Sequence, residues 1–132
     1  MKYLLDTNAC ISYLNNPASL VRTKLMRLKP SDAVLCSIVE AELHYGVMKS
    51  SKPLQNLAKL DYFLQQFSSV PFDGAAAQVF GRIRATLAKA GTPIGPYDLQ
   101  IAAIAVVNNL TLVSHNVREF SQVKDLLLED WE

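Results

Sequence analysis

The chain has 132 residues, enough for one domain with a buried core, and half of them are apolar. Thirteen basic and twelve acidic residues leave a net charge of +1, which by itself indicates neither a nucleic acid nor a membrane as partner. The longest apolar run, residues 101–107, is far too short to span a bilayer, and the first residues do not resemble a signal peptide. We therefore expect a single cytoplasmic domain, residues 1–132, without membrane contact.

The first half of the chain alternates short apolar strands with helices. Hydrophobic periodicity predicts, in order, a strand at 2–5, a helix at 9–14, an amphipathic helix after Pro17, a strand at 33–37 and a helix at 38–50. Asn8 is a candidate N-cap for the first helix, and Ser37 with Glu40 forms a capping-box pattern at the last one. The first strand ends at Asp6, so a carboxylate stands where a strand turns into a helix.

The second half continues the alternation. The predicted elements are a helix at 53–67 with a leucine stripe from Leu54, a strand at 70–72, a helix at 73–90, a helix at 95–109, a strand at 110–114, a turn or short helix at 116–120 and a last strand at 126–131. The helix at 95–109 is apolar nearly all round, which predicts a place deep in the core. Strands separated by helices imply right-handed crossovers, so we expect a three-layer α/β/α fold around a small, mainly parallel sheet.

Several chemistries lack their sequence motifs. Cys10 and Cys36 lie in apolar stretches without metal-site spacing, which favours reduced core thiols. The chain has no glycine-rich nucleotide loop and no nucleophile elbow. The stretch DTN has asparagine where an aspartyl phosphatase needs its second aspartate.

Two aspartates and an asparagine lie where the predicted sheet would bind a ligand. Asp6 ends the first strand, Asp98 lies in the first turn of the apolar helix, and Asn116 follows the strand at 110–114. Ligands of parallel sheets bind beyond the carboxyl ends of the strands, so these three residues are expected at one edge. Glu42 faces the apolar side of its helix, whereas Glu40 points the other way and is expected to complete the cap or pair with a histidine.

Convergence of Asp6, Glu42 and Asp98 requires a cation, because three carboxylates repel one another. Oxygen ligands without histidine or cysteine favour a hard ion, Mg²⁺ or alternatively Mn²⁺. A metal ion in such a site serves phosphoryl transfer, which makes phosphodiester hydrolysis the natural hypothesis.

Four segments, LLDTN, SIVEAELHYG, GTPIGPYDLQIAA and LTLVSHNVREF, resemble in order and spacing the PIN-domain ribonucleases, in particular the VapC-type toxins of bacterial toxin–antitoxin modules. The resemblance covers essentially the entire chain. It implies a Mg²⁺-dependent endoribonuclease acting on RNA, with tRNA as the expected substrate. It further implies a cognate VapB-type antitoxin that inserts a C-terminal segment into the active-site groove, and a homodimer within a toxin–antitoxin hetero-oligomer.

Carried over by position, the resemblance implies that Asp6 and Asp98 bind the metal and that Glu42 is the third acid. Asn116 stands where many members have a fourth acid, and Glu119 is the alternative. The resulting catalytic set is Asp6, Glu42, Asp98 and Asn116. The missing charge at Asn116 keeps two other functions open: a catalytically weak binding module that represses transcription with its antitoxin, and a flap-type DNA nuclease.

Overall fold

A computed structural model describes residues 2–132 and contains one five-stranded sheet. The strands are β1 (Tyr3–Leu5), β2 (Ala33–Cys36), β3 (Ser68–Val70), β4 (Thr111–Val113) and β5 (Leu127–Glu129). They lie in the order β3-β2-β1-β4-β5, and each neighbouring pair is parallel. The predicted small parallel sheet is therefore confirmed.

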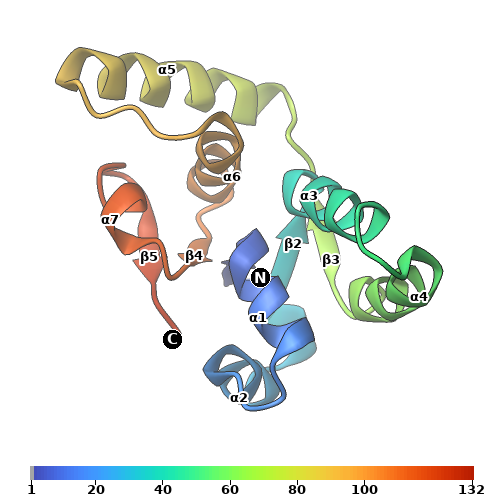
Figure 1. Cartoon of the computed structure of the whole chain (residues 1–132). Helices are drawn as coiled ribbons and strands as arrows, with labels where there is room; N and C mark the ends of the chain where they lie inside the picture. The colour runs from blue at the N-terminus through green and yellow to red at the C-terminus, as the bar shows by residue number, and fades with distance from the viewer. Residues whose placement is uncertain (1) are drawn as a thin grey trace.

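Helices fill the connections between the strands. They are α1 (Thr7–Asn15), α2 (Leu20–Met26), α3 (Ser37–Met48), α4 (Pro53–Leu64), α5 (Gly74–Ala90), α6 (Pro96–Val107) and α7 (Val117–Phe120), with one turn of 3₁₀ helix at Pro30–Asp32. Right-handed crossovers place α1 to α4 on one face of the sheet and α5 to α7 on the other. Figure 1 shows α5 and α6 at the top of the view and α1 and α2 at the bottom, with the strands between them, in agreement with the predicted α/β/α arrangement.

The chain reverses its direction across the sheet between β1 and β4. From β1 it continues outward to β2 and β3, whereas from β4 it continues to β5 on the other side. At this junction the backbone N–H of Asp6 donates to the carbonyl of Val113 over 3.1 Å. The crevice beyond such a switch point is the usual ligand site of parallel sheets, so the topology directs attention to Asp6.

The apolar helix α6 lies in the core, as its composition predicts. Its side chains from Ile101 to Ala105 are fully buried. Cys10 and Cys36 are buried and unpaired, and burial raises the pKa of Cys36 to about 11 and that of Cys10 well above its usual value, so both remain thiols at neutral pH. No helix within residues 2–132 is both long enough and apolar enough to cross a membrane.

Two predicted boundaries in the middle of the chain are wrong. The strand expected at 70–72 is Ser68–Val70, because Pro71 has no N–H for a sheet hydrogen bond. The helix expected to reach residue 67 ends at Leu64, and Leu54 is 84% exposed instead of lying on the buried stripe. Leu54 precedes the buried Phe63 by nine residues, which places the two on opposite sides of α4, about 180° apart.

Candidate functional site

Asp6 combines two roles at the end of β1. Its Oδ1 accepts a hydrogen bond from the backbone N–H of Ala9 over 2.8 Å, so Asp6 is the N-cap of α1. The predicted cap, Asn8, lies inside the helix and is exposed, and that prediction is wrong because the helix begins two residues earlier than expected. The cap uses only one carboxylate oxygen, and the Asp6 side chain is held in a fixed orientation at the switch point.

The surroundings of Asp6 oppose its charge. Asp6 is only 5% exposed, and burial raises the pKa of its carboxyl group. Hydrogen bonds from the buried Ser114 hydroxyl and from the Ala9 N–H lower the pKa in part, while the charges of Glu132 and Glu42 raise it further. A buried carboxylate with acidic neighbours is costly unless a cation accompanies it.

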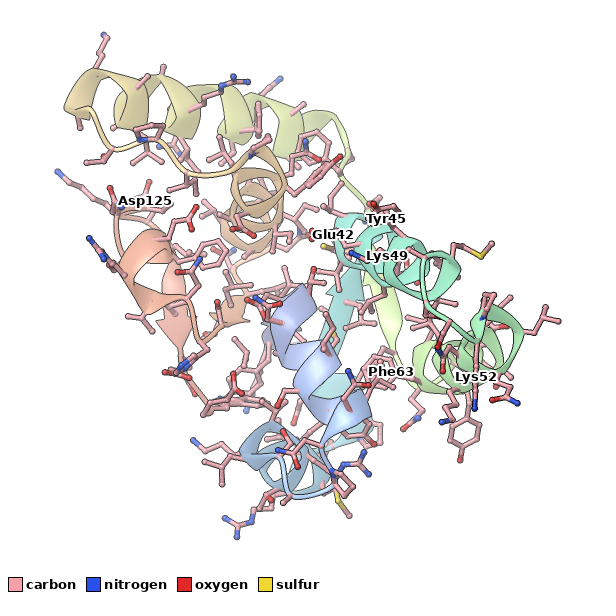
Figure 2. The ribbon with its side chains drawn as sticks, viewed as in Figure 1. Glu42, Tyr45, Lys49, Lys52, Phe63 and Asp125 are labelled. Atoms are coloured by element: carbon pink, nitrogen blue, oxygen red, sulfur yellow. The ribbon has the colours of Figure 1, made fainter. Side chains whose placement is uncertain are left out.

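Glu42 turns inward from α3, as its place on the apolar side predicts. Thr7 Oγ1 donates to Glu42 Oε1 over 2.7 Å, a bond that joins the start of α1 to α3. Figure 2 shows Glu42 between α1, α3 and α6. The bond holds one oxygen of Glu42 beside the residue that follows Asp6.

The neighbouring Glu40 is occupied elsewhere. Its Oε2 accepts from the Ser69 hydroxyl over 2.6 Å, at β3. The Ser37 hydroxyl accepts from the backbone N–H of Phe72 over 3.2 Å, and the N-cap of α3, Cys36, makes no side-chain cap hydrogen bond. The predicted capping box is wrong, because both of its side chains bind the β3 region instead of the helix start.

Asp98 lies in the first turn of α6 and is partly buried. Burial raises the pKa of Asp98 to about 6, and the charges of Glu119, Glu42 and Asp6, in that order, raise it as well. The charges of these three residues act on Asp98, so their carboxylates are its neighbours. Within residues 2–132, however, only His115, Asp130 and Glu132 place three ligand atoms within 4.8 Å of one another, so the four carboxylates are neighbours without forming so tight a group.

Asn116 holds Glu119 in place. Asn116 Nδ2 donates to Glu119 Oε2 over 2.7 Å, and the backbone N–H of Gly95 donates to Glu119 Oε1 over 3.0 Å. The backbone N–H of Asn116 donates to Ser114 Oγ over 3.0 Å, which leaves the Ser114 hydroxyl proton for Asp6. Glu119, three residues beyond Asn116 in α7, is therefore the fourth carboxylate of the group.

The donor set suits a hard divalent cation. Asp6, Glu42, Asp98 and Glu119 offer only oxygen atoms, and within residues 2–132 no lysine or arginine forms an ion pair with any of them. Hard cations such as Mg²⁺ and Mn²⁺ prefer such ligands. We call these four residues the carboxylate site.

A second group of ionisable side chains lies near the C-terminus and is exposed. His115, Asp130 and Glu132 present ligand atoms within 4.8 Å of one another, and His115 Nδ1 is 3.0 Å from Asp130 Oδ2. The pKa of Asp130 is lowered, first by the backbone N–H of Glu132 and then by His115. We call this the C-terminal cluster.

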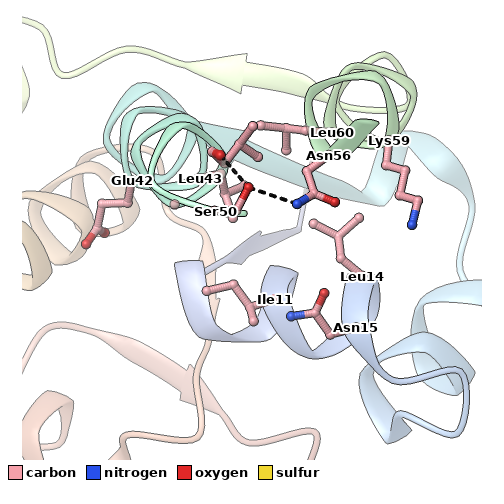
Figure 3. A pocket seen from close by; sticks show the side chains of 11 residues that line it. Ile11, Leu14, Asn15, Glu42, Leu43, Ser50, Asn56, Lys59 and Leu60 are labelled. Atoms are coloured by element: carbon pink, nitrogen blue, oxygen red, sulfur yellow. Dashed lines mark hydrogen bonds between the residues drawn. The ribbon is translucent and has the colours of Figure 1, made fainter. Parts of the chain in front are cut away.

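A groove of about 320 Å³ leads away from the carboxylate site between α1, α3 and α4. Its walls are mainly apolar and include Ile11, Leu14, Leu43, Val47 and Leu60. Figure 3 shows Glu42 at one end of the groove and Lys59 toward the other. Glu42 therefore belongs both to the groove and to the carboxylate site.

The model of the PIN domain matches residues 3–126. The chain belongs to the PIN-domain family. It is 40% identical over 133 residues to ribonuclease VapC2 of Rickettsia felis. The aligned region covers 100% of this chain and 99% of that relative. It is also 40% identical over 131 residues to the tRNA(fMet)-specific endonuclease VapC of Salmonella typhimurium, covering 99% and 98% of the two chains.

Solved PIN-domain structures agree with this assignment. VapBC2 from Rickettsia felis, bound to a DNA fragment from its promoter, matches with a TM-score of 0.93 and 38% identity over 100% of both chains. DNA-bound VapBC from Salmonella typhimurium matches with a TM-score of 0.95 and 39% identity, covering 100% of this chain and 99% of the other. The predicted family, a VapC-type PIN domain, is confirmed, and with it the predicted class of enzyme, a nuclease.

Proposed function

We propose that this chain is an endoribonuclease that hydrolyses tRNA with a divalent cation, Mg²⁺ or Mn²⁺, bound by the carboxylate site. The observation that carries the proposal is the position of Asp6, which is buried at the switch point of the sheet and is followed by Thr7, whose hydroxyl holds Glu42 over 2.7 Å. The relative named tRNA(fMet)-specific endonuclease VapC supports tRNA as the substrate. Asp6 and Asp98 hold the ion, and Glu42 and Glu119 complete its surroundings.

The chain's own residues have separate tasks in this chemistry. A bound divalent ion supplies positive charge that stabilises the transition state and lowers the pKa of water. Ala9 and Ser114 orient Asp6, while Asn116 and Gly95 orient Glu119. Thr7 binds Oε1 of Glu42, and Oε2 accepts the proton of the attacking water as the water oxygen bonds to phosphorus. The phosphate–oxygen bond of the RNA breaks in the same step, and the leaving oxygen takes a proton from solvent water.

We infer that a VapB-type antitoxin segment occupies the groove between α1, α3 and α4. The VapBC structures from Rickettsia felis and Salmonella typhimurium are the support for such a partner. Apolar walls accept apolar side chains, and a cationic side chain at the Glu42 end neutralises part of the carboxylate site. Binding there blocks RNA and metal together.

Three broader expectations accompany this function. Residues 1–132 act as one domain, since strands from both ends of the chain share the sheet. A tRNA substrate places the enzyme in the cytoplasm. We propose a homodimer, for which the exposed Leu54 and Tyr62 on α4 supply apolar surface, and Leu54→Glu lowers the mass measured by light scattering if α4 forms the interface.

The test is cleavage of initiator tRNA by the purified chain, with Mg²⁺ or with a chelator. We expect specific fragments with Mg²⁺, no fragments with chelator, and no fragments from Asp98→Asn. Single-stranded DNA serves as the competing substrate. Preference for DNA would favour a DNA nuclease, and absence of cleavage by chain free of antitoxin would favour a binding module.

A further inference from the structure

The outer side of α3 continues from the carboxylate site with an aromatic ring and a cation. Tyr45 follows Glu42 by one helical turn, and Lys49 follows Tyr45 by another. The backbone N–H of Lys49 still donates to the Tyr45 carbonyl over 3.1 Å, so the helical spacing extends to Lys49. Figure 2 shows the three side chains near one another along α3.

The Tyr45 ring is exposed without an evident structural role. It is 67% exposed, and no aromatic pair and no hydrogen bond of its hydroxyl occurs within residues 2–132. Its cation–π partner is Lys49, whose Nζ lies 4.9 Å from the ring centroid. An ammonium group on one face leaves the other face for a planar ligand.

Lys49 places a positive charge near the carboxylates, which repel RNA. Four carboxylates repel the phosphates of RNA, and a nearby cation is needed to hold the strand against the site. Two other basic side chains already have partners within the chain: Arg82 pairs with Asp125 over 3.2 Å, and Arg22 donates to the Tyr13 carbonyl over 2.6 Å. The ammonium of Lys49 is paired with no carboxylate within residues 2–132.

Resting on the proposed ribonuclease function, we propose that Tyr45 and Lys49 form an RNA subsite beside the carboxylate site. The Tyr45 ring stacks on the base of a nucleotide next to the cleaved bond, and the Lys49 ammonium binds a phosphate of the same strand. From Glu42, Tyr45 lies about 4.5 Å and Lys49 about 10.5 Å along the helix axis, a span suited to adjacent nucleotides. Unpaired tRNA bases are the substrate class that stacks on such a ring.

The test is steady-state cleavage of initiator tRNA by Tyr45 variants. Loss of one stacked base weakens binding by roughly 10-fold, so Tyr45→Ala raises KM about 10-fold while kcat changes less than about threefold. Tyr45→Phe keeps the ring and restores KM to within about twofold. Met26→Ala, which truncates a side chain 76% exposed on α2, leaves KM unchanged. Thermal melting confirms that each variant is folded.

The Lys49 contact has its own readout. Lys49→Ala raises KM and reduces the slope of log KM against log salt by about 0.7 to 0.9, the value for one lost phosphate contact. Lys49→Arg retains the slope. Lys52→Ala is the matched control, because Lys52 is exposed at the start of α4 (Figure 2).

The outcomes separate this inference from the function on which it rests. If the unaltered chain cleaves no tRNA, both are overturned. If it cleaves tRNA but Tyr45→Ala has the KM of Met26→Ala, only the subsite is overturned. If Tyr45→Ala leaves KM unchanged and instead weakens binding of an antitoxin peptide, the surface belongs to a protein partner and the RNA subsite is overturned.

Discussion

The carboxylate site and the C-terminal cluster contain similar residues in opposite environments. At the carboxylate site, burial raises the pKa of Asp6 and brings that of Asp98 to about 6. In the C-terminal cluster, the exposed Asp130 accepts hydrogen bonds and has a lowered pKa. Desolvation without a neighbouring cation distinguishes the two, and it is the reason we propose the first as the metal site.

The largest expected effect comes from neutralising Asp98 in the carboxylate site. Asp98→Asn removes a metal ligand, so the rate of tRNA cleavage falls at least about 100-fold. The same change removes a charge that repels three acids, so the metal-free protein at pH 8 melts a few degrees higher. Calorimetry measures the melting temperature, and a gel-based assay measures the rate of cleavage.

Asp130→Asn is the matched control in the C-terminal cluster. We expect cleavage within about twofold of the unaltered chain, because Asp130 is exposed and lies outside the carboxylate site. A loss as large as that of Asp98→Asn would show that the C-terminal cluster holds the essential ion.

The pH dependence of stability provides a second contrast. The pKa of Asp98 is higher in the folded chain, about 6, than its ordinary value of 3.8, so the folded state binds more protons between these values. The stabilisation that protonation provides is present below pH 3.8 and is lost as pH rises through 6. With chelator present, the melting temperature of the unaltered chain, measured relative to that of Asp98→Asn, should therefore fall by a few degrees between pH 5 and 7.

Added Mg²⁺ should reverse this fall above pH 6, because the ion binds the ionised carboxylate. The lowered pKa of Asp130 makes the folded chain less stable as pH falls, the opposite direction. This effect occurs only below the ordinary pKa of 3.8 and so lies outside the range from pH 5 to 7. A melting difference between the two chains that stays constant from pH 5 to 7 would contradict the raised pKa of Asp98.

A smaller effect distinguishes Glu119 from Asn116. Glu119→Gln removes a charge from the carboxylate site, and we expect Mn²⁺ affinity to fall by roughly 10-fold or more. Asn116→Ala removes only the amide that orients Glu119, and its effect should be smaller. The reverse order of affinities would identify Asn116 as the direct ligand.

The smallest effect is expected at Glu40. Glu40→Gln retains an acceptor for the exposed Ser69 hydroxyl, so both stability and cleavage should stay within about twofold of the unaltered chain. Glu42→Gln is the matched change two residues away and should reduce cleavage strongly. Equal losses in the two variants would mean that both glutamates serve the reaction.

The sequence predicts the fold and most of the site because the relevant patterns are local or topological. Apolar strands between helices determine the parallel sheet, and a parallel sheet brings Asp6 and Asp98 to one edge. The inward orientation of Glu42 follows from its place among apolar neighbours on a helix. These predictions need no knowledge of distant contacts.

The errors concern side chains whose partners are distant in sequence. Glu40 and Ser37 match a capping box, but Ser69 and the Phe72 backbone, more than 25 residues away, bind them instead. Asp6 takes the capping position expected for Asn8 because the helix begins directly at the strand end. The i to i+3 spacing of Asn116 and Glu119 was the available signal for the fourth carboxylate, and only the fold shows that it reaches Asp98.

Calorimetric titration of Mn²⁺ into the chain at pH 7.5 tests the central claim most directly, with Asp98→Asn and Asp130→Asn titrated in parallel. We predict saturable binding to the unaltered chain and to Asp130→Asn, and loss of that binding in Asp98→Asn. Unchanged binding to Asp98→Asn, or loss of binding in Asp130→Asn, would contradict the assignment of the carboxylate site as the metal centre.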